Sequence, residues 1–163
     1  MRNEKLRGVF ESLGFTNVST VITTGNVLFD SDSDDAPDLE ARIEAAWPDQ
    51  LGFTSTTIIR SGEQIQHLVD SNPFGDLEDK PTSRLEVTFL KHEPEDDHDF
   101  PYTPDRGDFT ILGVADRAIY SVVDLTQPRT PQVMSWINRQ YGKEITTRAW
   151  TTVNRIARRL EST

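Results

Sequence analysis

Hydrophobic positions along the chain follow two spacings, one typical of helices and the other typical of strands. A spacing of three to four residues recurs in five segments and predicts an amphipathic helix in each. Short runs rich in Val, Ile, Thr and Phe predict strands between them. The predicted helices lie at 6–13, 39–47, 61–71, 130–141 and 150–160; the predicted strands lie at 18–29 (two strands or one bulged pair), 54–60, 85–90, 109–112, 118–123 and 145–148.

Cap residues mark the ends of several predicted helices. Gly14 and Gly142 follow the last periodic residue of a helix and suit a left-handed C-cap. Ser61 and Gln64 have the spacing of a capping box. Thr130-Pro131 has the character of an N-cap followed by the first helical residue. These signals fix the expected helix boundaries.

The two halves of the chain share a pattern. Residues 58–61 and 146–149 occupy equivalent places, each with an arginine at the end of a strand and before a helix. Ile65 and Val153 then follow at the same offset. This weak repeat predicts a duplicated unit of the β-α-β-β-α-β type, with helices packed on one face of each sheet. We therefore expect an α+β fold of two ferredoxin-like plaits in tandem.

Six short motifs run in order over nearly the whole chain: Leu13–Val18, Thr24–Phe29, Ile59–Ser61, Asn72–Phe74, Val87–Leu90 and Thr146–Val153. As a series they resemble the Domain of Unknown Function 1697 family of bacterial proteins. The resemblance implies a tandem ferredoxin-like fold and carries no established activity.

The chain departs from that family at its start. Members usually open with a strand, an arginine and a glycine-rich turn before the first helix, whereas this sequence begins inside that helix. The first plait, 1–74, is therefore expected to lack its N-terminal strand, and the second, 84–163, to carry an extra C-terminal helix. Empty strand positions leave backbone groups unpaired at about 1–3 kcal/mol each. A start codon assigned too late is the favoured explanation; a strand supplied by a partner chain, or a sheet that closes around the gap, are the alternatives.

Charge and composition exclude several classes of protein. The chain has 27 acidic and 17 basic residues, a formal net charge of −10, which opposes bulk binding to nucleic acid or to an anionic membrane surface. No apolar run approaches the 18 residues of a membrane span. With no cysteine, a disulfide scaffold and cysteine-ligated metals are excluded. We expect a soluble cytoplasmic protein.

The clearest candidate site is basic. On the terminal helix, arginines project from the side opposite the apolar stripe, and a further arginine precedes the helix. Guanidinium groups bind phosphates and carboxylates in bidentate fashion. The sequence therefore predicts an anion site, with pairing to the surplus carboxylates or simple solvation as the alternative. The residues are Arg148, Arg155, Arg158 and Arg159.

A second set of polar residues lies at strand ends and is a candidate pocket lining. Bends, helix caps and core packing are the structural alternative. The set is Thr24, Gly25, Asn26, Thr147, Trp150 and Thr151. The acidic loop 91–99 holds His92 and His98, six residues apart, which fits no zinc-protease motif. No metal or cofactor is expected.

These features favour a non-catalytic binding or interaction module for a small anionic ligand or a partner protein. A small enzyme with a site between the two halves is one alternative, although no nucleophile elbow or P-loop motif occurs in the sequence. A truncated chain completed by strand exchange in a homodimer is the other.

Overall fold

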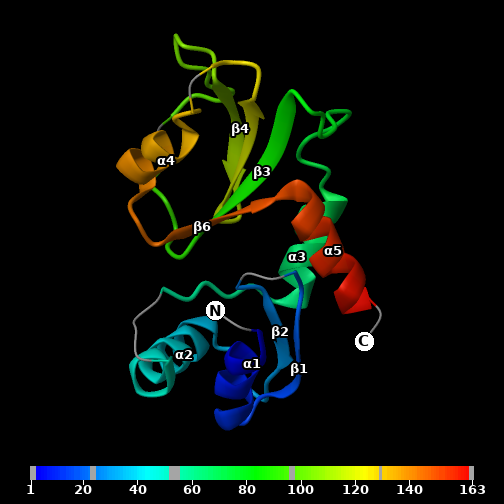
Figure 1. Ribbon diagram of the computed structural model, residues 1–163, viewed down its shortest axis with the longest axis vertical. Helices are drawn as coiled ribbons and strands as arrows, with labels where there is room; N and C mark the ends of the chain where they lie inside the picture. The colour runs from blue at the N-terminus through cyan, green and yellow to red at the C-terminus, as the bar shows by residue number, and fades with distance from the viewer. Residues whose placement is uncertain (1–2, 23–24, 52–55, 96–97, 129, 162–163) are drawn as a thin grey trace. The chain divides into compact units, whose positions relative to one another are not determined.

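The computed structural model describes residues 3–22, 25–51, 56–95, 98–128 and 130–161 (Figure 1). The chain divides into two compact units, the first of residues 1–65 and 155–163 and the second of residues 66–154. The described helices and strands follow one another as α1 (Asn3–Ser12), β1 (Thr16–Thr20), β2 (Val27–Asp30), α2 (Ala36–Leu51), α3 (Gly62–Asp70), β3 (Ser83–Leu90), β4 (Phe109–Ala115), β5 (Ala118–Asp124), α4 (Val133–Tyr141), β6 (Ile145–Ala149) and α5 (Trp150–Glu161).

The core of the first unit lies between helices α1 and α2 and the β1–β2 pair. The two strands are antiparallel, with Thr20 opposite Val27 and an irregularity between Thr16 and Ser19. Val27 and Phe29 of β2 pack against the apolar side of both helices. The buried cluster consists of Leu6, Val9, Phe10, Phe15, Leu39, Ile43, Ala46 and Trp47. The predicted periodicity of α1 and α2 is confirmed, because the apolar stripe of each helix is the side that is buried.

The strand expected at 54–60 is wrong over its described part, residues 56–60, which pairs with no strand. Two of its backbone N–H groups donate hydrogen bonds to side chains instead. Thr57 donates to Glu44 Oε1 at 3.3 Å, and Ile59 donates to Glu40 Oε2 at 2.9 Å. Two carboxylates on α2 thus take the place of a neighbouring strand. Residues 54 and 55 lie outside the described residues.

Most of the predicted caps are confirmed. Ser61 N–H donates to Gln64 Oε1 at 2.7 Å, and Gln64 N–H donates to Ser61 Oγ at 3.1 Å, which is the reciprocal capping box at the start of α3. Gly14 and Gly142 both have a φ of +88°, a positive value that glycine adopts without strain, at the ends of α1 and α4.

The second unit is built on one four-stranded sheet of order β4-β5-β3-β6, in which every neighbouring pair is antiparallel. β3 is central, and its last six residues are all buried. Such a strand needs cover on both faces of the sheet. On one face, Phe74 packs its ring 6.0 Å from Tyr120 and 5.1 Å from Trp150.

Helix α4 covers the other face through Val133, Trp136 and Ile137. The expected N-cap at Thr130 is wrong. The helix begins at Val133 after Gln132, which makes no side-chain cap. Asp108, distant in sequence and only 1% exposed, accepts the Gln132 N–H at 2.9 Å and so supplies the missing cap.

The described residues therefore form a mixed α+β fold with five helices and two antiparallel sheets. Within the described ranges, no helix combines the length and apolar character that a membrane crossing requires.

Candidate functional site

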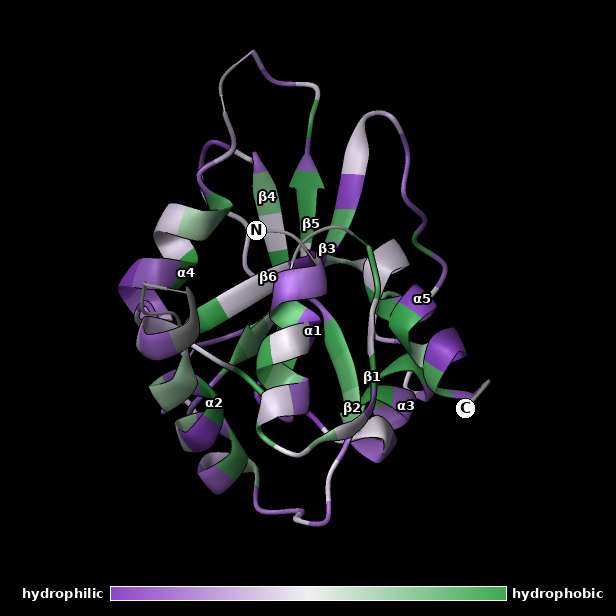
Figure 2. Cartoon of the chain, turned by 60° about the horizontal axis from the view of Figure 1, so that its bottom comes forward, coloured by the Kyte–Doolittle hydropathy of each residue, from purple (hydrophilic) through white to green (hydrophobic). Residues whose placement is uncertain are grey.

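Three arginines of α5 lie close together on one side of the helix. Arg155, Arg158 and Arg159 are separated by three and four residues, so they are surface neighbours; all three are exposed. We call them the arginine face. The other side of α5 is apolar, with Val153 and Ala157 only 1% and 4% exposed. Figure 2 shows hydrophobic and hydrophilic positions separated around this helix.

Two members of the arginine face, Arg155 and Arg158, have no carboxylate partner among the described residues of their unit. Since acidic residues outnumber basic ones by 27 to 17, such a local excess of positive charge is unusual for this chain. The geometry presents guanidinium groups to solvent, where they can bind an anion.

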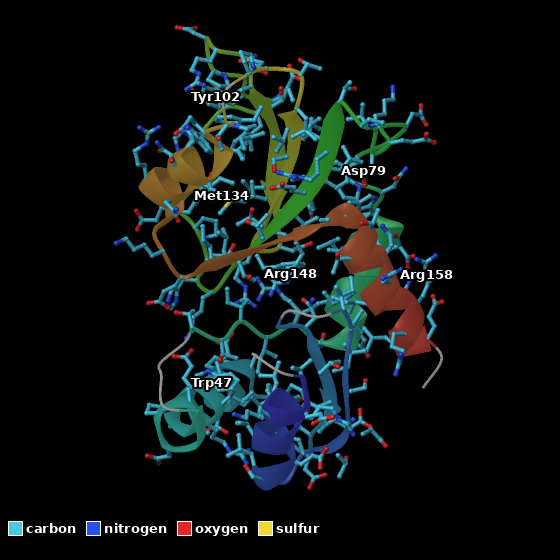
Figure 3. All side chains as sticks on the ribbon, in the orientation of Figure 1. Trp47, Asp79, Tyr102, Met134, Arg148 and Arg158 are labelled. Carbon is cyan, nitrogen blue, oxygen red and sulfur yellow. The ribbon has the colours of Figure 1, made fainter. Side chains whose placement is uncertain are left out.

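Arg148 belongs to the second unit and has a different environment. It lies in β6 opposite Val87, half-buried. Its Nη1 donates to Thr146 Oγ1 at 2.6 Å and to the Thr147 carbonyl at 3.0 Å. Burial lowers the pKa of its guanidinium below the ordinary value, because the charged form loses hydration. Figure 3 labels Arg148 on β6 and Arg158 on α5. Whether all four predicted arginines serve one anion stays a prediction.

The residues predicted at the β1–β2 connection make local contacts. Gly25 has a φ of +68°. Asn26 is 9% exposed and closes the loop, because its Nδ2 donates to the Val21 carbonyl at 3.2 Å while Val21 N–H donates to the Asn26 carbonyl at 3.0 Å. Thr24 lies outside the described residues. A ligand role for this loop stays a prediction.

The other predicted pocket residues point in different directions. The Thr147 hydroxyl pairs with the buried Thr88 hydroxyl at 2.7 Å and lies 3.3 Å from Met134 Sδ. Trp150 packs against Phe74. Thr151 is exposed at the start of α5. Thr147 and Trp150 therefore have packing roles. An enzyme site between the two halves stays a prediction.

The two histidines of the 91–99 loop have separate partners. His92 Nε2 lies 2.9 Å from Glu144 Oε2, and Lys91 Nζ approaches the same oxygen at 3.9 Å. His98 packs instead against aromatic rings. Over the described ranges, no three His, Asp or Glu side chains are grouped as a metal site would require.

Comparison with known proteins places the chain in a family. A family model described as "Protein of unknown function (DUF1697)" matches residues 1–120. The chain belongs to the DUF1697 family. It is also similar to a solved structure of the conserved bacterial protein SP0830 from Streptococcus pneumoniae, with a TM-score of 0.68 and 17% identity over 96% of this chain and 87% of that chain. At that identity the similarity shows the fold alone. No curated protein matches the sequence.

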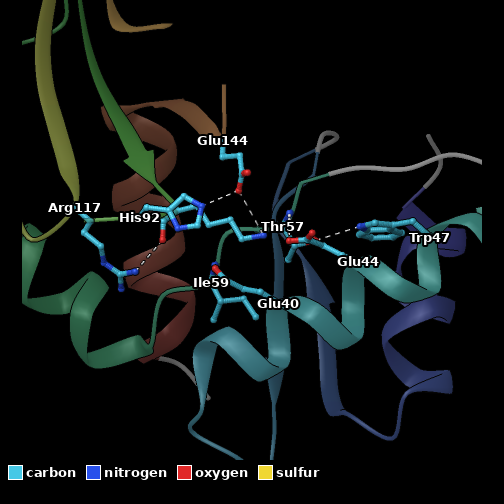
Figure 4. A network of polar contacts seen from close by, with 9 residues as sticks. Glu40, Glu44, Trp47, Thr57, Ile59, His92, Arg117 and Glu144 are labelled. Carbon is cyan, nitrogen blue, oxygen red and sulfur yellow. Dashed lines mark hydrogen bonds and ion pairs between the residues drawn. The ribbon is translucent and has the colours of Figure 1, made fainter. Parts of the chain in front are cut away.

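Three side-chain contacts to the backbone of this DUF1697 chain were not predicted from the sequence, namely those of Glu40, Glu44 and Asp108. Glu40 and Glu44 have the i, i+4 spacing of side chains on one helix face, a signal that could have paired them with an extended segment. Figure 4 shows both carboxylates directed at the backbone of residues 57–59. Asp108 gives no comparable signal, because its partner is 24 residues away and the contact depends on the fold.

Proposed function

We propose that this DUF1697 protein is a non-catalytic binding module, and that the arginine face of α5 holds an anionic partner. The observation that carries the proposal is the pair of exposed guanidinium groups on Arg155 and Arg158 without a described carboxylate partner in their unit. Exposed arginine forks recognise phosphate and carboxylate groups by charge-assisted, bidentate hydrogen bonds. A flat helix face suits a group presented by the partner rather than a fully enclosed ligand.

The strand order of the second unit bears on the fold to which α5 belongs. The β4-β5-β3-β6 order is the order of a ferredoxin-like plait, with the 91–108 connection in the place of its first helix. We propose two such plaits in tandem, within residues 1–74 and 84–163, in a cytoplasmic protein. The absence of cysteine is compatible with that compartment.

Charge reversal at the arginine face tests the function. Inorganic phosphate, pyrophosphate, ATP and an Asp/Glu-rich peptide are titrated into the wild type and into the double variant Arg155→Glu/Arg158→Glu, with Kd and Tm as readouts. The control variant Arg139→Glu/Lys143→Glu makes the same change in net charge at exposed positions of the second unit. We expect at least one probe to bind the wild type and the control alike, and about tenfold or more weaker binding to the reversed arginine face.

The probes also distinguish the source of the anion. Preference for ATP or pyrophosphate indicates a phosphate ligand, and preference for the peptide indicates an acidic protein segment. Two outcomes would remove the proposal: no probe binds the wild type, or reversal at 155 and 158 weakens binding no more than the control does.

A second candidate function is strand exchange between two copies of the chain. The specific observation is that residues 56–60 are extended, yet Thr57 and Ile59 donate their N–H groups to carboxylates rather than to a strand. The β1–β2 pair beside them is two-stranded, which is marginal by itself in water. A strand from a second copy would replace the carboxylates as acceptor by β-strand addition.

Light scattering after size-exclusion chromatography, combined with amide hydrogen exchange, tests this candidate. We expect a dimer at high concentration and concentration-dependent protection of the Thr57 and Ile59 amides. A strict monomer over the whole range, with unchanged exchange at both amides, excludes strand exchange.

A further inference from the structure

The His98 ring is surrounded by aromatic side chains in the second unit. Its centroid lies 5.6 Å from Trp136, 6.2 Å from Phe100 and 6.2 Å from Tyr141. His98 itself is exposed, whereas Phe100 and Tyr141 are half-buried and Trp136 is 8% exposed. An exposed imidazole is thus placed against one buried and two half-buried rings.

The three rings come from one loop and one helix, and all three pack in the core of the second unit. Phe100 belongs to the 91–108 connection, and Trp136 and Tyr141 lie on α4, 6.2 Å apart. Tyr102 stacks on the indole of Trp136 at 5.1 Å with an interplanar angle of 23°. Figure 3 labels Tyr102 beside α4. Trp136 is therefore fixed by packing, and its ring orientation does not depend on His98.

This arrangement matches the geometry of cation recognition by aromatic rings. A cation is attracted to a ring face when it lies within about 6 Å of the centroid, and several rings around one position form a cage for quaternary ammonium groups. The His98 centroid lies inside this distance from Trp136, at 5.6 Å, and at its limit from Phe100 and Tyr141, at 6.2 Å each. The local charge also favours a cation, because the exposed Glu95 and Asp99 flank His98 in the same loop and the chain carries a net charge of −10.

We propose that Phe100, Trp136 and Tyr141 form a binding site for a small molecule with a quaternary ammonium group, and that His98 occupies this site in the free protein. The ammonium group replaces the imidazole when the side chain rotates out toward solvent. Because the ligand must displace His98, binding to the wild type is weakened by the stability of the closed state. This site is separate from the arginine face and takes a ligand of opposite charge.

Choline is the probe for this site, and its uncharged isostere 3,3-dimethylbutan-1-ol is the matched control ligand. Calorimetric titrations compare the full-length wild type with His98→Ala, which opens the site. His67→Ala removes another exposed histidine of the same unit and is the control variant. We expect His98→Ala to bind choline about tenfold more tightly than the wild type and His67→Ala to match the wild type. The neutral isostere should bind His98→Ala at least about tenfold more weakly than choline does.

Removal of one ring tests whether the rings bind the cation. Phe100→Leu and Tyr141→Leu, each in the His98→Ala background, keep apolar volume but lose the aromatic face. Each should weaken choline binding, with the circular dichroism spectrum unchanged as a check on folding. The proposal fails if His98→Ala binds choline no better than the wild type, if the isostere binds equally well, or if either ring substitution leaves choline binding unchanged.

Discussion

Ile59 donates its backbone N–H to Glu40 Oε2 at 2.9 Å, and Glu40 is only 5% exposed. One helical turn later, Glu44 accepts the N–H of Thr57. The match follows from geometry: residues i and i+4 of a helix are about 6 Å apart along its axis, and residues i and i+2 of an extended chain are about 6.7 Å apart. Two carboxylates one helical turn apart can therefore accept hydrogen bonds from alternate N–H groups of one segment. Helix α2 binds residues 56–60 in this way, in place of a neighbouring strand.

Removal of the Glu40 carboxylate should destabilise the first unit. Glu40→Ala leaves the partly buried Ile59 N–H without its acceptor, and we expect a loss of about 1 kcal/mol in the free energy of unfolding. Glu40→Gln keeps an oxygen acceptor and should lose less. Chemical denaturation measures both variants. The control is Glu44→Ala, whose longer 3.3 Å bond and partial exposure predict a smaller effect. Equal stability of Glu40→Ala and wild type would contradict this role.

Asp108 should be required for the start of α4. Its Oδ2 accepts the Gln132 N–H, while its Oδ1 is buried without a hydrogen bond. Asp108→Ala removes the cap and should cost about 1–2 kcal/mol, whereas Asp108→Asn retains one acceptor and should cost less. Thermal unfolding and amide exchange at Gln132 measure the difference. Asp105→Ala, at an exposed position of the same connection, should leave the unfolding curve unchanged.

The Thr88 and Thr147 hydroxyls should be energetically coupled. They lie 2.7 Å apart on neighbouring strands, and Thr88 is completely buried. Thr88→Val or Thr147→Val alone removes one partner of a buried hydrogen bond, at about 1 kcal/mol, whereas the double variant removes both and should cost less than the sum. A double-mutant cycle by urea denaturation gives the coupling. Additive effects would show that the hydroxyls act independently.

Alkaline pH should weaken the second unit through Tyr120. Burial, and then the Asp116 carboxylate, raise the pKa of the Tyr120 hydroxyl above its ordinary value of 10.0. The pKa of Tyr120 is therefore higher in the folded than in the unfolded protein. The protonated hydroxyl contributes its full stabilisation of the folded state below pH 10, and this stabilisation is lost as the pH rises through the folded-state pKa. Asp116 also lies 3.7 Å from His67.

Ultraviolet titration of the tyrosinates should show late ionisation of Tyr120. Tyr120→Phe should remove that late step together with the corresponding loss of stability, and Asp116→Asn should move the step to lower pH. A Tyr120 that titrates at pH 10 or below would disprove the assignment.

Several elements could be predicted from the amino-acid sequence because their signals are local. The apolar stripes of α1, α2, α4 and α5, the capping box of Ser61 and Gln64, and the glycines that end two helices depend on residues within a few positions of one another. The same stripe that buries Val153 necessarily exposes Arg155 and Arg158. These features follow from a period of 3.6 residues and from local backbone chemistry.

The partners of the long-range hydrogen bonds, in contrast, depend on how the chain packs in three dimensions. Residues 56–60 have the composition of a strand, but whether an extended segment becomes one depends on the neighbour that accepts its N–H groups, and here the neighbour is a pair of carboxylates. The N-cap of α4 was decided in the same way by Asp108, and the rings around His98 meet because the 91–108 connection packs on α4. Contacts between residues far apart in sequence depend on packing, which no local pattern encodes.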